Sequence, residues 1–281
     1  MRHLPELQSL PPAYAVHRCP DLNKLAMMST APFQLYVWPQ HLLMLGPAYA
    51  SAQHRHHAAQ IAFGLDGPVI FESPQRGLHL ADMLLISPNT PHAHPAFGAL
   101  AFLYLYPESV EWRNFPGREM RGLVPLPFNQ RLRSVARYAA AGDVIAAQSL
   151  VDDLIGKSAS NALSDDALVS RAVALINRSL DGPITLADVA KAVHRSPSRL
   201  AHRFSEATGV PLRRYVLWCR LRTAADAAMR GASLTEAAHL AGFADSAHLS
   251  RTFRATFGVA PSLLFKDGHA HVTFCETAAN L

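Results

Sequence analysis

The sequence predicts a two-domain α+β protein, in which a β-barrel and a helical hairpin precede an all-helical domain with two helix-turn-helix units. Three observations predict this architecture. Short apolar runs separated by Gly, Pro and Asn fill residues 31–112. The apolar spacing changes to about 3.6 residues after Asn129, and one helical pattern occurs twice within residues 184–264.

The composition is that of a globular protein. The chain has 281 residues, of which 49% are hydrophobic and 17% are charged, enough for two ordinary cores. No run of eighteen apolar residues occurs, and the start, MRHLPELQSLPP, lacks the apolar segment of a secretory signal. The three scattered cysteines, Cys19, Cys219 and Cys275, form no CxxC pair, which fits a reducing compartment. We therefore expect a cytoplasmic protein with no membrane partner.

Positive charge is concentrated in the C-terminal part. Residues 1–160 carry 12 Lys and Arg against 11 Asp and Glu, whereas residues 183–257 carry 11 against 5. A local excess of this kind suggests a polyanionic partner, although many solvated helix faces are also basic.

The first domain is placed at residues 1–128, with residues 1–30 as a proline-containing arm that is either packed on it or partly disordered. Short strands without helices between them indicate a sandwich or barrel. The apolar runs that predict the strands are FQLYVW (33–38), HLLML (41–45), AQIAFGL (59–65), VIFES (69–73), MLLI (83–86) and ALAFLYLY (99–106).

A helical hairpin is predicted at residues 129–157. Gly142 suits the end of its first helix and Asp143 the N-cap of its second. Its apolar faces would serve either as a flap on the barrel or as a dimer seam. The small, polar residues 158–166 predict a linker, residues 167–266 form the second domain, and residues 267–281 are a C-terminal tail. Only helices are predicted beyond Asp165.

The first helix-turn-helix unit begins with a helix over 186–193, capped by Thr185 in a capping-box pattern with Asp188. His194-Arg195 forms the turn. Ser196 then caps a second helix that ends at Gly209.

The second unit repeats this plan. A helix over 234–243 is followed by a turn at Gly242 and by a second helix, over 245–258, with Asp245 as N-cap. The helix 212–230 is a rigid connector that fixes the distance between the two units.

The two second helices have the chemistry of DNA readers. A helix that enters the major groove needs short polar and Arg side chains on its outer face and an apolar stripe behind. Here Leu200 and Phe204, and then Leu249, Phe253 and Phe257, repeat on the inner faces. The candidate DNA-binding residues are Ser196, Ser198, Arg199, His202, Arg203, Ser246, His248, Arg251 and Arg254.

The segments ITLADVAKAVHRSPSRLAHRFSEATGVPLRRYV and LTEAAHLAGFADSAHLSRTFRATFGVAPS closely resemble the AraC/XylS family of bacterial transcription regulators. The resemblance implies that two reading helices enter successive major-groove segments of double-stranded DNA. By position it assigns base reading to Ser198, Arg199 and His202 in the first helix, and to Ser246, Ala247, His248 and Arg251 in the second. Ala201 and Ala247 depart from the family, whose members often carry a larger polar reader there.

Many members of that family carry a cupin-like β-barrel, and AYASAQHRHHAAQIAFGLDGPVIF and LADMLLISPNTPHAH are similar to the two cupin motifs. In a strand, His54 and His56 share one face and His57 takes the other, and His92 and His94 form a second same-face pair. Imidazoles from two strands could hold Zn²⁺, Ni²⁺, Cu²⁺ or Fe²⁺. Gln60, however, sits where cupin metal enzymes usually have an acid.

The alternative to a metal site is an apolar pocket for a small organic effector, lined by residues such as Phe63, Phe71 and Tyr104. The six candidate residues for effector or metal are His54, His56, His57, Gln60, His92 and His94. With an organic effector, the histidines among them would form hydrogen bonds or sense pH near neutrality.

The sequence thus predicts a sequence-specific, effector-responsive DNA-binding regulator and not an enzyme. The effector would shift the population that binds an operator or contacts RNA polymerase, and a homodimer would form through the hairpin. The alternative is a metal-dependent cupin enzyme with an appended helical domain, against which Gln60 counts. The sparse use of lysine argues against a non-specific architectural DNA binder.

Overall fold

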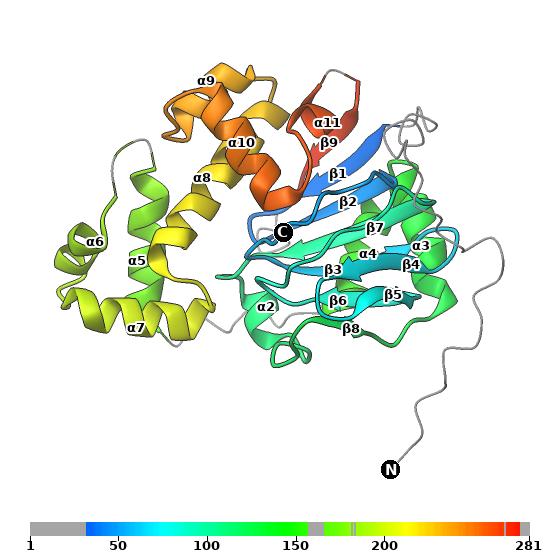
Figure 1. Ribbon diagram of the computed structural model, residues 1–281, viewed down its shortest axis with the longest axis horizontal. Coiled ribbons are helices and arrows are strands. Elements are labelled where there is room, and N and C mark those ends of the chain that lie inside the picture. Colours follow the sequence, from blue (N-terminus) through cyan, green and yellow to red (C-terminus); the bar gives the residue numbers. More distant parts are fainter. Residues whose placement is uncertain (1–31, 157–165, 181, 183, 267, 276–281) are drawn as a thin grey trace, which may run out of the picture.

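The computed structural model describes residues 32–156, 166–180, 182, 184–266 and 268–275 (Figure 1). The predicted arm at residues 1–30 and almost all of the predicted linker lie outside these residues. The first part of the chain contains β1 (Phe33–Val37), β2 (His41–Pro47), β3 (Ala59–Gly64), β4 (Val69–Ser73), β5 (Gly77–Ala81), β6 (Met83–Ile86), β7 (Ala99–Leu105), α2 (Val110–Asn114), β8 (Leu123–Pro125), α3 (Gln130–Ala140) and α4 (Val144–Ile155).

Within the described residues, seven strands form one sheet in the order β8-β6-β3-β7-β2-β1-β9, and β4 pairs with β5 in a separate hairpin. Successive side chains of a strand point to opposite faces, and here both faces are buried. Leu43 and Leu45 face one core, whereas Met44 between them faces another. This burial on both sides explains why the strands are nearly continuous apolar runs rather than alternating ones.

The helical hairpin covers one face of the sheet. Leu132 and Ala136 of α3 and Leu150 of α4 share a core with Leu43 and Leu103 of the strands. Hydrogen bonds from backbone amides confirm the predicted N-cap of α4, since Asp143 accepts from Ala146, and a matching cap begins α3 at Asn129. The hairpin therefore packs on the sheet as a flap would.

The second part of the chain is mainly helical. Its helices are α5 (Ala167–Arg178), α6 (Leu186–Ala192), α7 (Pro197–Thr208), α8 (Leu212–Met229), α9 (Leu234–Leu240), α10 (Ser246–Phe257) and α11 (Ser262–Phe265). The predicted capping box of Thr185 and Asp188 is confirmed, and Ser233 and Glu236 form its counterpart at the start of α9. Both units thus begin with the same reciprocal pair of hydrogen bonds.

The tight turns of the two units use the same left-handed backbone. Gly242, between α9 and α10, has φ +72°, and a Cβ there would lie 2.4 Å from the carbonyl oxygen of Leu180. His194, at the matching place between α6 and α7, has φ 55°. Glycine is needed in the second turn because the chain passes so close to another backbone.

The second helix-turn-helix unit packs on the other face of the sheet. Leu221 of α8 and Phe253 of α10 share a core with Met44 and Phe102 of the strands. The first unit has mostly its own core, which includes Ile176, Leu200 and Phe204. Figure 1 shows α5, α6 and α7 beyond one end of α8, away from the sheet, and α9 and α10 beside its other end.

The expectation of helices alone after Asp165 is wrong. Residues Ala270–Phe274 form β9, which pairs in parallel with β1 and places Leu35 opposite Val272. A five-residue strand is stable only when a sheet edge is available, and β1 supplies that edge from more than two hundred residues away. This strand joins the C-terminal part of the chain to the sheet of the first part.

No helix in the described residues is long and apolar enough to cross a bilayer.

Candidate functional site

The two predicted reading helices present exposed polar faces. Leu200 and Phe204 of α7, and Leu249 and Phe253 of α10, are buried behind them. Eight of the nine candidate DNA-binding residues are exposed, and Ser246 is half-buried. Ser196 accepts a hydrogen bond from the amide of Arg199, so it acts as the N-cap of α7. The outer faces are therefore accessible along both helices.

The arginines on these faces differ in their surroundings. Within the described part of the chain, Arg199, Arg251 and Arg254 have neither a hydrogen-bond partner nor an ion-pair partner for their guanidinium groups. Arg203 instead lies 2.8 Å from Asp166 and 2.8 Å from Glu206. Its guanidinium is held between two carboxylates, whereas the other three can reach a polyanion without breaking a bond.

The histidines of the two helices also differ. Nδ1 of His202 lies 4.0 Å from Glu206, at the outer limit of an ion pair. The ring of His248 packs edge-on against Phe243, with ring centroids 5.3 Å apart, and its amide donates to the Asp245 N-cap. The ring of His248 is thus held by a neighbouring aromatic ring, whereas that of His202 has only the long contact with Glu206.

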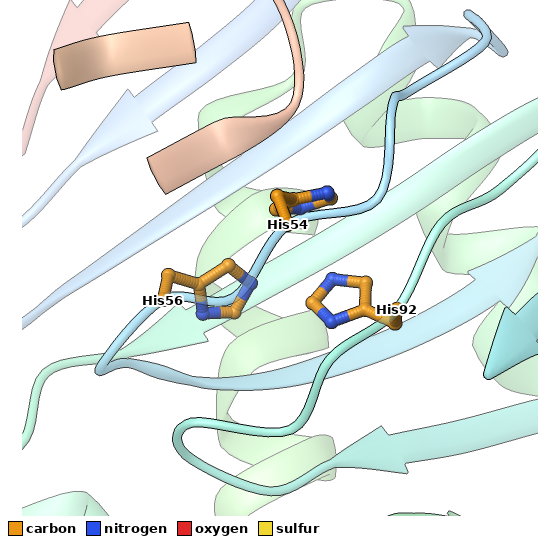
Figure 2. Close-up of side chains that lie close together, drawn as sticks. All are labelled: His54, His56 and His92. Atoms are coloured by element: carbon orange, nitrogen blue, oxygen red, sulfur yellow. The ribbon is translucent and has the colours of Figure 1, made fainter. Parts of the chain in front are cut away.

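Three of the predicted effector or metal residues come together beneath the second unit. His54, His56 and His92 are all buried, and one ring nitrogen of each lies within 4.8 Å of the others (Figure 2). The backbones of His54 and His92 pair as an isolated antiparallel bridge, with two N–H···O bonds of 2.9 Å. Burial lowers the pKa of His54, and it holds the pKa of His56 at about 3 and that of His92 well below its ordinary value. The three imidazoles are therefore neutral.

The other three predicted residues have different partners. His57 points to Asn89, whose side-chain oxygen is 2.5 Å from its Nδ1. His94 lies among aromatic rings, with its centroid 5.3 Å from those of Phe71 and Phe102. Gln60 stays beside the cluster, with its side-chain oxygen 3.0 Å from Nε2 of His56.

A cavity of about 630 Å³ lies between the sheet and α8. Its walls are mostly apolar and come from both parts of the chain, including Leu35, Met44 and Tyr104 of the strands and Trp218 and Phe257 of the helices. Of the three pocket residues suggested by the sequence, only Tyr104 lines it. Phe63 faces the hairpin core because its position on β3 alternates to the other side of the sheet.

The charged groups of this cavity are paired within the chain. Arg222 of α8 lies 2.6 Å from Glu108, and Arg230 lies 3.0 Å from Asp226. The indole N–H of Trp218 is buried and has no hydrogen-bond partner among the described residues. The sequence analysis does not predict these residues. A signal for them exists, because α8 carries apolar residues on several faces and buries eight side chains, as expected of a helix enclosed on more than one side.

Comparisons with known proteins agree with this arrangement. Residues 189–267 match the family described as a helix-turn-helix domain. The transcriptional activator NphR of a Rhodococcus species is 32% identical over 137 residues, which are 48% of this chain and 40% of NphR. The uncharacterized HTH-type transcriptional regulator YidL of Escherichia coli is 32% identical over 106 residues, which are 37% of this chain and 36% of YidL. The matches thus span well under half the length of these relatives.

ToxT of Vibrio cholerae has the same two-part fold. A structure of apo ToxT superposes with a TM-score of 0.55 at 15% identity, covering 79% of this chain and 96% of that one. A ToxT structure described as bound to an unsaturated fatty acid gives a TM-score of 0.53 at 14% identity, covering 83% and 98%. The tandem motif and the matched domain thus show an AraC-type helix-turn-helix domain in the C-terminal part of the chain, and the ToxT structures share the fold of the whole described chain.

Proposed function

We propose that this protein is a sequence-specific DNA-binding transcription regulator, in which α7 and α10 read successive segments of the major groove. The observation that carries the proposal is the pair of exposed helix faces whose Arg199 and Arg251 have no partner among the described residues. Arginine is the commonest reader of guanine edges, and both helices are rigidly capped. The relatives, which are named as transcription regulators, support the same function and not the alternative of an enzyme.

The test begins with selection of a bound sequence from a random DNA pool, using the full chain. Arg251→Ala should then weaken binding by about 1–3 kcal/mol and relax discrimination at one base pair. Arg178→Ala is the matched control, because this exposed arginine lies on α5 and not on a reading helix. Recovery of no preferred sequence, or equal losses for both variants, would exclude the assignment.

The cavity between the sheet and α8 is the proposed effector site. Its apolar walls suit a hydrophobic body, and the indole N–H of Trp218, which has no partner among the described residues, suits one hydrogen-bond acceptor oxygen. The unsaturated fatty acid bound to ToxT, which has the same fold, supports an amphipathic molecule of that kind. An occupant would contact α8, Phe253 and Phe257 at once, so it could shift the second unit relative to the sheet.

Oleate is a suitable first probe, with quenching of tryptophan fluorescence as the signal because Trp218 and Trp38 line the cavity. The variant Ala225→Trp should fill the space and remove oleate binding while leaving operator binding measurable. If operator affinity is the same without any amphiphile, with oleate and with chemically different amphiphiles, the proposed coupling between effector binding and operator binding is wrong.

The proposal also assigns a role to each segment of the chain. Residues 1–128 would sense the effector, 129–157 would form a dimer face, 158–166 would link, 167–266 would bind DNA and 267–281 would form the tail. Tyr138 and Ile145 on the hairpin are 66% and 83% exposed, which supports a homodimer through this surface. Ile145→Asp should lower the oligomeric state in analytical ultracentrifugation. RNA polymerase is the further partner through which a bound regulator would act.

A further inference from the structure

The charges around the cavity between the sheet and α8 balance one another. The charged residues of its lining are Arg222, Asp226 and Arg230. Arg222 is paired with the carboxylate of Glu108, and Arg230 is paired with that of Asp226. The guanidinium of Arg230 also stacks on Phe274, 3.7 Å from the ring centre. An anionic ligand would therefore meet no unpaired cation among the lining residues that the structure describes.

The inner end of the cavity is unfavourable for a second negative charge. Arg222 and Glu108 are both mostly buried, so a ligand carboxylate beside Arg222 would face the Glu108 carboxylate in a region of low dielectric constant. Such a ligand would have to bind a proton first, which costs free energy at neutral pH. At the rim, Asp226 and Arg230 are 43% and 58% exposed, and water weakens any attraction there.

The inner end nevertheless offers polar contacts to an uncharged group. The indole N–H of Trp218 and the Oε2 atom of Glu108 are buried and have no hydrogen-bond partner in the described part of the chain. Tyr106 lies between them, because its ring centre is 4.8 Å from the Arg222 guanidinium and 5.8 Å from the Trp218 ring. One atom is a donor and the other an acceptor, and leaving either buried without a partner is costly.

We propose that the effector is an uncharged apolar molecule with a hydroxyl group, an alcohol or a phenol, and not a carboxylate. This inference rests on the proposed role of the cavity as the effector site. A hydroxyl oxygen can accept from Trp218 while its hydrogen is donated toward Glu108, so one small group matches both unpaired atoms. The apolar body would contact the aromatic wall, which includes Trp38, Tyr104 and Phe257.

The test compares dodecanol with dodecanoate, which have the same chain length and differ in the head group. Isothermal titration calorimetry with the full chain at neutral pH should show dodecanol binding about tenfold or more tightly, because the carboxylate alone must be protonated or repelled. Tighter binding of oleyl alcohol than of oleate should repeat this order. Equal or tighter binding of dodecanoate would overturn the uncharged class, although the cavity would remain the effector site.

A matched pair of variants tests the hydrogen bond. Trp218→Phe keeps an aromatic ring but removes the N–H donor, so it should weaken dodecanol binding about three- to tenfold. Trp112→Phe is the control, because Trp112 lies in the core between the sheet and the helical hairpin, and it should bind dodecanol as the wild type does. Equal affinities for the two variants would overturn the hydroxyl contact.

A gain-of-binding variant tests the charge argument independently of folding. Asp226→Asn removes the carboxylate that pairs with Arg230, so dodecanoate affinity should rise by about two- to fivefold. Misfolding cannot produce such a gain, and an unchanged affinity would overturn the argument from charge balance. Binding of neither molecule to the wild type would overturn both the effector site and its ligand class. All of these measurements are made without DNA, so they do not depend on an operator.

Discussion

The Arg222 guanidinium on α8 lies 2.6 Å from the Glu108 carboxylate, which follows β7, and so joins the helix between the two helix-turn-helix units to the sheet. The same guanidinium stacks over Tyr106, 4.8 Å from its ring centre. Both side chains are mostly buried, with 27% and 14% of their surface exposed. Because a buried charge without its partner is costly, this pair holds the two parts of the chain in one relative position.

Glu108→Gln should therefore destabilise the protein by about 2–4 kcal/mol, since it leaves the Arg222 charge facing a neutral amide. Urea unfolding followed by tryptophan fluorescence measures the change. The double variant Glu108→Gln, Arg222→Met should regain part of the loss. If the single variant is as stable as the wild type, the pair does not hold the interface.

β9 gives a second way to loosen the same interface. The amide of Phe33 donates to His269, and that of Cys275 donates to Val37. In a parallel ladder the donors alternate, so Thr273 supplies an amide in between. Thr273→Pro removes that donor and should speed amide exchange across Phe33–Val37, whereas Thr273→Val should leave the exchange unchanged. Equal protection in both variants would mean that β9 contributes nothing to docking.

Local signals are enough to predict the helices of the two helix-turn-helix units. Thr185, Ser196 and Asp245 are caps because hydroxyl and carboxylate groups bond to amides two or three residues away, and such bonds depend on nearby sequence alone. The inward stripe of Leu200 and Phe204 is equally local. These features are therefore visible without the fold.

Contacts between distant parts of the chain are not visible in this way. The sequence does not predict β9 because its partner β1 lies at the other end of the chain. It predicts α8 only as a connector, whereas Trp218 and Leu221 of α8 line the cavity that faces the sheet. His92 and His94, predicted as a same-face pair, both lie beside Phe71, with ring centroids 5.9 and 5.3 Å away. Only His92 of this pair joins His54 and His56, because that grouping depends on the loop before β3, which is distant in sequence.

The buried His41 predicts a loss of stability in acid. Burial lowers its pKa from 6.5 to about 4. Glu111 lies 4.0 Å away, and neither ring nitrogen of His41 has a hydrogen-bond partner among the described residues. Between these values the unfolded chain binds a proton that the folded chain does not. The stabilising contribution is thus complete above pH 6.5 and declines as the pH falls toward 4.

The variant His41→Phe keeps the stacking on Trp38, where ring centroids are 4.7 Å apart, but cannot be protonated. The free energy of unfolding should fall less steeply with acid in this variant, by up to about 1.4 kcal/mol per pH unit. Urea unfolding at a series of pH values between about 7.5 and about 5 measures the slope across the titration range of an ordinary histidine, with His239→Phe as an exposed control. Parallel slopes for His41→Phe and the wild type would show that His41 does not titrate in this range.

Arg199 and Arg203 on α7 should differ in their effect on DNA binding, although both are exposed and the sequence predicts both as contacts. Arg203 is held by Asp166 and Glu206, so reaching DNA means giving up two ion pairs, whereas Arg199 gives up none among the described residues. Arg199→Ala should weaken operator binding by about 1–3 kcal/mol, and Arg203→Ala by less than about 0.5 kcal/mol. Electrophoretic mobility shifts at several salt concentrations measure both. A larger loss for Arg203→Ala would mean that this side chain leaves its carboxylates when DNA arrives, because the energy of exposed ion pairs is small enough for a phosphate to replace them.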